Sequence, residues 1–317
     1  MIEIRQLTKV FDTRPAVDRV TFDVRPGEVL GFLGPNGAGK STTMKMITGF
    51  LKPTSGGARV CGHEVTEDPI AAQRCIGYLP EGAPLYPDMT PASLLRFVAE
   101  VRRMEPARAR QRTDEVIALV GIEGVMEQRI DTLSKGFKRR VGLATAILHD
   151  PEVLILDEPT DGLDPNQKEE VRKLIRRMAH DKVILLSTHI LEEVEAVCTR
   201  AIIISEGRVL FDGTPSELRG RSAIHGAVRL HLKGAPADAA CSALNGLGEV
   251  ERVETLEDGP ADDILCLRAY PVDDAPILHA ITELARGQGW NVQHLSVERG
   301  NLDEVFRTIT TGSGAPS

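Results

Sequence analysis

The sequence lacks any long apolar run. Its longest uninterrupted apolar stretches, such as 153–156 and 183–186, have the length of β-strands, whereas a helix that crosses a bilayer needs about 20 apolar residues. The segment MIEIRQLTKV has charges scattered through it and no apolar stretch of signal-peptide length. If the chain serves passage across a membrane, we therefore expect another polypeptide to form the path.

Cysteine is scarce as well, and its spacing forms no recognisable pattern. The count of five is odd, and no two cysteines stand in a C-x-x-C pair. The sequence therefore predicts neither a disulfide framework nor a zinc site. Reduced thiols in a cytoplasmic compartment fit this usage best. The cysteines are Cys61, Cys75, Cys198, Cys241 and Cys266.

An excess of positive charge is also missing. The formal net charge is −8, so no nucleic-acid partner is expected. Apolar residues make up 42% and charged residues 26% of the sequence, which is ordinary for a globular protein. A chain of 317 residues is long enough for one large and one smaller domain. Basic residues gather only locally, as in the segment 135–140.

The strongest motif is a Gly-rich segment between an apolar strand at 29–33 and a helix that begins near Lys40. Glycines let backbone N–H groups point at phosphate oxygens, and the helix N-terminus adds partial positive charge. Lys40 would reach the β- and γ-phosphates, and the Ser41 hydroxyl would bind Mg²⁺. A Gly-rich turn without a ligand is the alternative, yet every fixed position of the P-loop pattern G-x-x-x-x-G-K-[ST] is matched. The segment comprises Gly34, Pro35, Asn36, Gly37, Ala38, Gly39, Lys40 and Ser41.

An acidic pair ends the apolar run 153–156. Carboxylates at the carboxyl end of a parallel strand lie where α/β proteins bind ligands. We expect Asp157 to hold Mg²⁺ and Glu158 to orient or deprotonate the attacking water. Alone, such a pair is usually a solvated helix start, but after a P-loop it predicts a Walker B motif.

The segment Leu133-Ser134-Lys135-Gly136-Phe137 lies between these two motifs. With it, residues 1 to about 220 resemble the ABC ATPase family, whose signature is LSGGQ. The resemblance implies that Ser134, Lys135 and Gly136 contact the γ-phosphate of ATP held by a second subunit, aided by the dipole of the following helix. Lys135 and Phe137 replace a glycine and the glutamine, so the motif is a variant.

Further family elements follow from the same resemblance. Asp161-Gly162-Leu163-Asp164 is similar to the D-loop that joins two ATP sites, which implies a role for Asp164 in the nucleotide site. His189 is similar to the switch histidine that contacts the γ-phosphate, although a histidine after a strand is often only a surface residue. Phe11 resembles the aromatic residue that stacks on adenine, with a core phenylalanine as the alternative. Thr42, which follows the P-loop serine, is expected to bind the phosphates as well.

Two features leave questions open. Glu81 stands where the family has the Q-loop glutamine; it offers an oxygen to Mg²⁺ but adds negative charge to a site that already holds Asp157 and Glu158. The basic segment 135–140 sits at a helix start, where the macrodipole disfavours cations. Either a bound triphosphate compensates these charges or they form a solvated basic face.

We predict an α/β fold in which residues 1–221 form a P-loop ABC ATPase domain. This domain would have a mixed sheet core and a helical subdomain over about 82–148. Residues 222–310 alternate strand-helix-strand twice, the order of a small α+β ferredoxin-like domain. The tail 311–317 is small and polar and is predicted to be disordered.

The variant signature, the segment 77–81 and the C-terminal extension together resemble ABC-2 type ATPases, which work mostly in export. Among these, drug- or polymer-export and gliding-motility ATPases are the most similar. The resemblance implies ATP hydrolysis to ADP and phosphate with Mg²⁺, a second ATPase subunit, separate transmembrane permease subunits, and a place at the cytoplasmic face of the membrane.

The alternative is a soluble ABC ATPase that acts on a macromolecular complex such as a ribosome or a chromosome. A single P-loop and the absence of sustained heptads in the sequence count against it. A kinase or GTPase is disfavoured because signature and D-loop have no role in a monomeric site. The transported cargo leaves no mark on this sequence.

Overall fold

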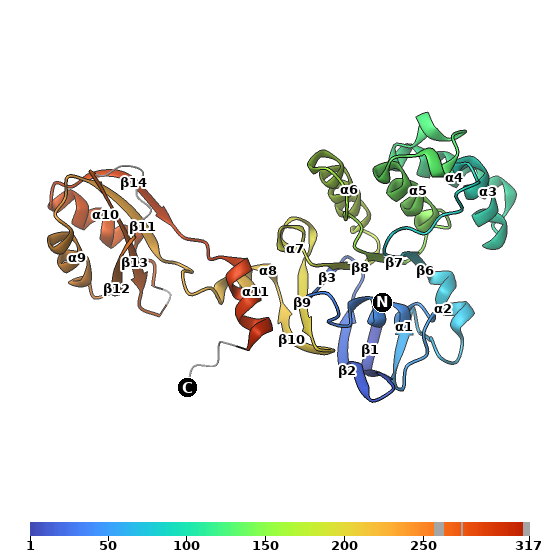
Figure 1. Cartoon of the computed structure of the whole chain (residues 1–317), viewed down its shortest axis with the longest axis horizontal. Coiled ribbons are helices and arrows are strands. Elements are labelled where there is room, and N and C mark those ends of the chain that lie inside the picture. Colours follow the sequence, from blue (N-terminus) through green and yellow to red (C-terminus); the bar gives the residue numbers. More distant parts are fainter. Residues whose placement is uncertain (257–262, 274, 313–317) are drawn as a thin grey trace. The chain divides into compact units, whose positions relative to one another are not determined.

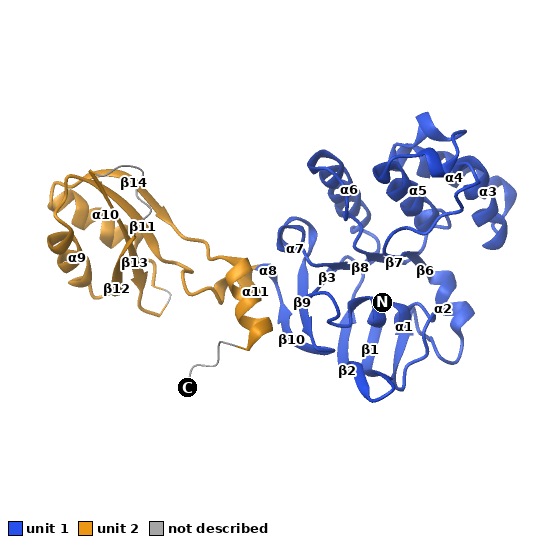
Figure 2. Cartoon of the chain, viewed as in Figure 1, with its two compact units in different colours: residues 1–215 blue, residues 216–317 orange. Residues whose placement is uncertain are grey.

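The computed structural model describes residues 1–256, 263–273 and 275–312 (Figure 1). The chain forms two compact units, 1–215 and 216–317 (Figure 2), and each has its own buried apolar core. The division falls between Pro215 and Ser216, whereas the predicted boundary after residue 221 and the predicted subdomain over 82–148 stay predictions. In the described part of the chain, no helix has the length and apolar character needed to span a bilayer.

The first unit contains two sheets. One is antiparallel in the order β2-β1-β4-β5, and the other runs β10-β9-β3-β8-β7-β6. All pairs from β9 to β6 are parallel, and β10 is an antiparallel edge. The predicted α/β fold with a mixed sheet core is confirmed. The strands are β1 (Ile2–Phe11), β2 (Arg14–Val24), β3 (Val29–Leu33), β4 (Ser55–Val60), β5 (His63–Glu64), β6 (Ile76–Leu79), β7 (Val153–Asp157), β8 (Val183–Thr188), β9 (Arg200–Ser205) and β10 (Arg208–Gly213).

The central strands β3, β7 and β8 are buried along their whole length. Their continuous apolar runs are typical of parallel strands covered on both faces. Helix α1 (Lys40–Ile47) contacts β2 and β4 of the antiparallel sheet and β7 of the parallel sheet. Met44, Met46 and Ile47 of this helix are therefore buried in one core with both sheets, and this packing fixes the loop that precedes the helix.

A helical layer lies beyond the edge strand β6. Helices α3, α4 and α5 contact one another, and α5 also contacts β6. Thr90 and Ser93 form a capping box at the start of α3. The Glu105 side chain caps α4. The remaining helices of the unit are α2 (Pro69–Cys75), α3 (Pro91–Val101), α4 (Pro106–Val120), α5 (Lys135–Ile147), α6 (Pro165–Met178) and α7 (Leu191–Val197), with 3₁₀ turns at Glu123–Val125 and Ile130–Thr132.

The second unit has a sheet in the order β12-β13-β11-β14 with antiparallel pairs. Helices α9 and α10 contribute apolar side chains to its core. Strand-helix-strand twice with this order is the predicted ferredoxin-like arrangement, which is confirmed. Its elements are β11 (Val228–Lys233), α9 (Ala237–Asn245), β12 (Val250–Leu256), β13 (Ile264–Pro271), α10 (Leu278–Gly287) and β14 (Asn291–Val297), preceded by α8 (Pro215–Gly220).

A last helix, α11 (Leu302–Thr311), was not among the predicted elements. The Asn301 side chain accepts hydrogen bonds from the backbone N–H groups of Asp303 and Glu304 and so caps this helix. The tail predicted to be disordered begins at Thr311, which is the last residue of α11; residues 313–317 of that tail lie outside the described residues.

A chain that ends at Gly220 is expected to fold and to keep its nucleotide site, because the core of the first unit and all nucleotide motifs precede this residue. Circular dichroism melting and a thermal shift with ATP would measure both properties. A second fragment, 216–312, has its own core and serves as the control: it should fold but show no thermal shift with ATP. An insoluble first fragment, or one without a cooperative transition, would contradict the independence of the unit.

Candidate functional site

The predicted nucleotide motifs follow neighbouring strands of the parallel sheet. Strands β3, β8 and β7 are adjacent, and Asp157 pairs with Ser187 in register. The P-loop follows β3, and His189 follows β8. Asp157 is the last residue of β7, and Glu158 comes directly after it. Parallel strands end at one edge of a sheet, so the fold brings these three motifs together. The loop that carries Glu81 follows β6, the next strand along the same edge.

Two glycines determine the path of the P-loop. Gly39 adopts φ +105° at the start of α1, where a Cβ would lie 2.5 Å from the Ala16 carbonyl oxygen. A Cβ on Gly34 would lie 2.3 Å from the Ile204 carbonyl oxygen. Among the described residues, no side chain caps α1, and its first turn holds no acidic residue. The first N–H groups of α1 are therefore suited to bind a phosphate.

Lys40 is buried at this edge, with 6% of its surface exposed. Its Nζ donates hydrogen bonds to the carbonyl oxygens of Gly34 at 2.6 Å and Pro35 at 3.2 Å, and lies 3.9 Å from Glu158 Oε1. Burial lowers the pKa of Lys40, and the neighbouring carboxylates, Glu158 first, oppose that shift. The loop thus holds a cation in place without neutralising it fully.

Glu158 has a backbone conformation that side-chain-bearing residues rarely adopt, with φ +51°. Its N–H donates hydrogen bonds to the carbonyl oxygen of Ser187 at 3.2 Å and to the Ser187 hydroxyl at 3.1 Å. These two hydrogen bonds hold the turn in place. The Glu158 Oε2 lies 2.6 Å from His189 Nδ1. Burial raises the pKa of Glu158, while His189 and Lys40 lower it in part. The carboxylate is therefore a stronger base than an ordinary glutamate.

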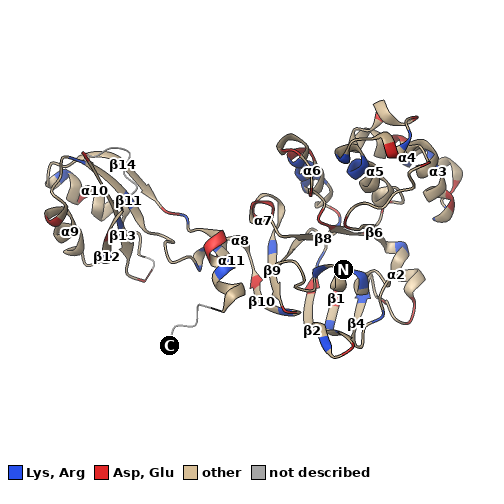
Figure 3. Ribbon diagram, in the orientation of Figure 1, with Lys and Arg blue, Asp and Glu red and all other residues tan. Residues whose placement is uncertain are grey.

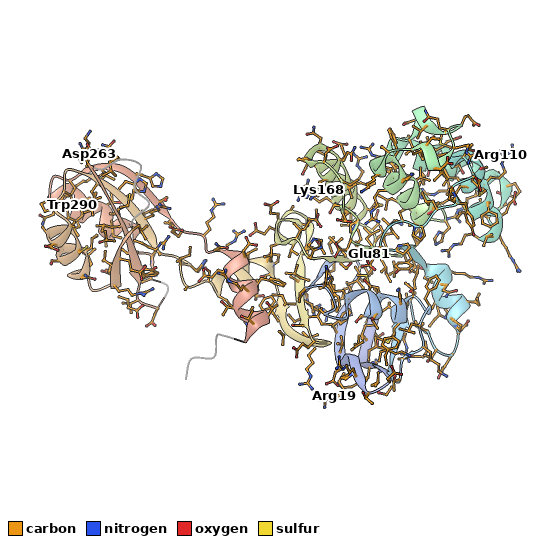
Figure 4. The ribbon with its side chains drawn as sticks, in the orientation of Figure 1. Arg19, Glu81, Arg110, Lys168, Asp263 and Trp290 are labelled. Carbon is orange, nitrogen blue, oxygen red and sulfur yellow. The ribbon has the colours of Figure 1, made fainter. Side chains whose placement is uncertain are left out.

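Asp157 is the best-defined candidate for metal binding. It is 1% exposed, and its Oδ1 accepts a hydrogen bond from the Ser187 hydroxyl. Its Oδ2 is buried and has no hydrogen-bond partner among the described residues, an arrangement that costs free energy unless a cation satisfies the oxygen. The half-buried Ser41 and the exposed Glu81 (Figure 4) add further oxygen donors. This hard donor set fits Mg²⁺.

The signature segment lies against the D-loop and the start of α6. Ser134 caps α5, its hydroxyl accepting a backbone N–H of the first turn at 3.3 Å. A Cβ on Gly136 would lie 2.5 Å from Gln167 Oε1, and one on Gly162 would lie 3.8 Å from Lys135 Cδ. Signature and D-loop thus form one surface, on which Ser134 and Lys135 are exposed.

The other predicted nucleotide contacts differ in their surroundings. Phe11 is 48% exposed, with the Lys9 ammonium 5.2 Å from its ring centroid, so the core alternative is wrong. The Asp164 Oδ1 accepts the Gln167 N–H at 2.9 Å and caps α6; its contact with ATP stays a prediction. His189 is both exposed and bound to Glu158. Within the loop, Pro35, Asn36 and Gly37 are exposed, Ala38 is buried and Thr42 is half-buried.

Arg139 was not recognised as a buried residue from the sequence. It is 6% exposed, and its guanidinium donates to the carbonyl oxygens of Pro159 at 2.9 Å, Asp157 at 3.2 Å and Pro80 at 3.4 Å. Burial lowers its pKa. The hypothesis of a solvated basic face is therefore wrong for Arg139, which ties α5 to the end of β7 and to the loop after β6. Figure 3 shows the basic residues gathered in α5.

Glu193 is a second buried charged residue that the sequence analysis missed. It is 1% exposed, and its Oε1 accepts the hydroxyl of Thr160, just after the acidic pair. Its Oε2 accepts the hydroxyl of Thr188 at 2.7 Å, and Thr188 Oγ1 accepts the N–H of Ile190 at 3.0 Å. One carboxylate thus joins the segments on either side of the site and positions the turn that carries His189.

The variant Glu193→Gln is expected to destabilise the first unit. An amide has one oxygen, so one of the two threonine hydroxyls would face an N–H group and lose its acceptor. A loss of about 1–3 kcal/mol in the free energy of unfolding follows, which lowers Tm by several degrees. Glu192→Gln is the matched control, because Glu192 is exposed. If both variants melt at the same temperature, the buried network contributes nothing measurable.

Comparisons with known proteins extend these observations. The family described as "ABC transporter" matches residues 17–161. The daunorubicin/doxorubicin resistance ATP-binding protein DrrA of Streptomyces peucetius is 35% identical over 98% of this chain and 92% of its own length. The linearmycin resistance ATP-binding protein LnrL of Bacillus subtilis is 30% identical over 98% of both chains. The Nod factor export ATP-binding protein I of Paraburkholderia xenovorans is 38% identical over 68% of this chain and 72% of its own.

Solved structures agree with the fold of the first unit. An ATP-binding subunit of an ABC transporter is 32% identical with a TM-score of 0.65, covering 70% of this chain and 92% of that one. The dimeric ATP-binding cassette MJ0796, solved with ADP and Pi, is 23% identical with a TM-score of 0.63, covering 68% and 99%, and supports the fold alone. The chain belongs to the ABC transporter family, in which it is an ATP-binding subunit and an ATPase.

Proposed function

We propose that this chain is the ATPase of an ABC-2 type exporter. Two copies close around two ATP molecules at the cytoplasmic face of the membrane and drive separate transmembrane permease subunits. The observation that carries this proposal is the extent of the likeness to two resistance ATP-binding proteins, which runs over 98% of the chain and so includes both units. The Nod factor export protein supports the same direction through a shorter match.

In this proposal the phosphates of ATP bind at the N-terminus of α1. Lys40 exchanges its bonds to the Gly34 and Pro35 carbonyl oxygens for phosphate oxygens, which carry full negative charge. Phe11 is exposed and offers a ring face for adenine. When bound, Mg²⁺ neutralises charge on the β- and γ-phosphates, and Asp157 and Ser41, with Glu81 at the same edge, are the residues that would hold it.

Glu158 then serves as the base for the attacking water. Its pKa is raised by burial, which strengthens its ability to accept a proton, and the Lys40 charge keeps the ionised form accessible. His189, whose Nδ1 lies 2.6 Å from Glu158 Oε2, orients the carboxylate, and in this proposal it also contacts the γ-phosphate. The water oxygen bonds to the γ-phosphorus as the P–O bond to the leaving ADP breaks, and the proton of that water passes to a Glu158 oxygen.

The site is completed by the surface that the signature and the D-loop share. Ser134 is exposed at the N-terminus of α5, and Lys135 beside it is exposed too. An exposed helix N-terminus with a hydroxyl and a cation binds anions. We propose that the anion bound here is the γ-phosphate of the ATP held by the second copy, and that the Gly136 N–H donates a hydrogen bond to it. Asp164 of the D-loop would then face the nucleotide site across the dimer contact.

The variant Glu158→Gln tests this arrangement. The P-loop and Lys40 stay intact, so ATP is expected to bind, while turnover falls by about two orders of magnitude or more because the base is lost. A ligand that binds only the dimer stabilises it by about 2.7 kcal/mol per site at a hundredfold excess over its Kd. Light scattering should therefore detect an ATP-bound dimer, and a second change, Ser134→Arg, should return the protein to monomer.

Glu192→Gln, an exposed acid outside the site, is the control and should behave as the unchanged protein. A Glu158→Gln protein that stays monomeric in saturating ATP would argue against a dimer formed by this chain alone. The Glu158→Gln protein, purified with ATP from solubilised membranes of its source organism, should co-purify with a permease that has several apolar spans. Recovery of a ribosomal or chromosomal complex instead would overturn the exporter proposal.

The pH dependence of turnover follows from Glu158. The base must be ionised, and its ionised fraction falls as pH drops through a pKa that burial has raised. The acid limb of kcat/KM should thus lie above the ordinary glutamate value of about 4.3. His189 lowers the pKa of Glu158, so His189→Ala should move the residual acid limb to higher pH. An unchanged acid limb or a shift to lower pH would contradict its assignment to Glu158.

A further inference from the structure

Two cysteines that are distant in sequence meet one glutamate in the first unit. Cys61 follows β4, Cys75 is the last residue of α2, and Glu152 directly precedes β7. One ligand atom from each lies within 4.8 Å of the other two. Among the described residues this is the one group of three or more histidine, cysteine or acidic side chains close enough to share a metal ion. It plays no part in the nucleotide site.

We propose that Cys61, Cys75 and Glu152 bind one zinc ion, with water as the fourth ligand. Thiolate sulfur and carboxylate oxygen are both zinc ligands, and zinc is bound in tetrahedral geometry. Thiolates disfavour Mg²⁺ and Ca²⁺, which take oxygen ligands. The absence of a C-x-x-C pair hid the group in the sequence, because the fold and not the spacing brings the thiols together.

One distance within the group matches that of a formed zinc site. With Zn–S of about 2.3 Å and Zn–O of about 2.0 Å, a sulfur and an oxygen of one tetrahedron lie about 3.5 Å apart. The Cys61 Sγ lies 3.6 Å from Glu152 Oε2.

The backbone around the group is fixed by long-range pairing. Strands β6 and β7 start side by side, with Ile76 opposite Val153, so Cys75 and Glu152 are neighbours by register. The Cys61 N–H donates to the Met1 carbonyl oxygen at 2.9 Å, which ties this turn to β1.

Both thiols are half-buried and Glu152 is exposed, so an ion has a route from solvent. The bound ion would join the turn after β4 to the starts of β6 and β7, and so link the two sheets.

Binding can be measured on the full, reduced chain without nucleotide. Co²⁺ should give one equivalent of thiolate-to-metal charge-transfer absorption with tetrahedral ligand-field bands. Zn²⁺ should displace it in a competition titration and raise the Tm of the chain. Cys61→Ser and Cys75→Ser should abolish the charge-transfer band of a two-thiolate site and weaken zinc binding by about a hundredfold, and Glu152→Gln should weaken it by about tenfold.

Cys241→Ser is the matched control, because Cys241 is also half-buried but lies in the second unit, and it should bind zinc unchanged. Glu152 is exposed, so its variant keeps the fold even if a cysteine variant does not. Equal zinc affinity in the unchanged protein and the Cys61→Ser, Cys75→Ser double variant would overturn the proposal. A Cys61–Cys75 disulfide formed on mild oxidation, with no cobalt band in the reduced chain, would overturn it in favour of a redox pair.

Discussion

The nucleotide site depends on holding two opposite charges at the buried edge of a parallel sheet. Burial lowers the pKa of Lys40 and raises that of Glu158, so each charge disfavours the folded state by itself. The ion pair between Nζ and Oε1, 3.9 Å apart, the P-loop carbonyl oxygens and His189 offset this cost only in part, because the pKa values of both groups stay shifted. Such an arrangement is poor for stability alone. It is suited to a ligand that brings negative charge to Lys40 and a water molecule to Glu158.

Local patterns in the sequence were sufficient to predict the parts of this site. The P-loop spacing, the apolar runs of β3, β7 and β8, and the acids after β7 each lie within a few consecutive residues. The order of the strands could not be predicted, because pairing between distant segments leaves no local pattern. Strand β8 lies between β3 and β7, and this order alone brings His189 within 2.6 Å of Glu158. Resemblance to a family supplied only the expectation that His189 contacts the γ-phosphate, and not its contact with Glu158.

Buried polar residues were the principal omission. Glu193 stands beside Glu192, and Arg139 beside Arg140, yet only the first of each pair is buried. Their burial follows from which face of α7 and α5 packs on the sheet, and a one-residue offset on a helix decides it. Both residues bind backbone or hydroxyl groups next to the acidic pair. The residues that hold the turn after β7 in place are therefore set by tertiary packing, while the residues predicted to contact the nucleotide follow short motifs.

The basic start of α5 shows how the fold separates these two roles. The helix dipole disfavours cations there, and three of the four are tied to carbonyl oxygens: Arg139 as described, Lys138 to Asp131 at 2.9 Å, and Arg140 at 3.2 Å to a carbonyl at the end of α4. Among the described residues, Lys135 has no such partner and stands exposed beside Ser134. Its charge adds to the partial positive charge of the helix N-terminus, so repulsion remains until an anion arrives. In the proposed dimer, a phosphate presented by the second copy would remove that repulsion, and association would then have a driving force that depends on ATP and is lost with hydrolysis.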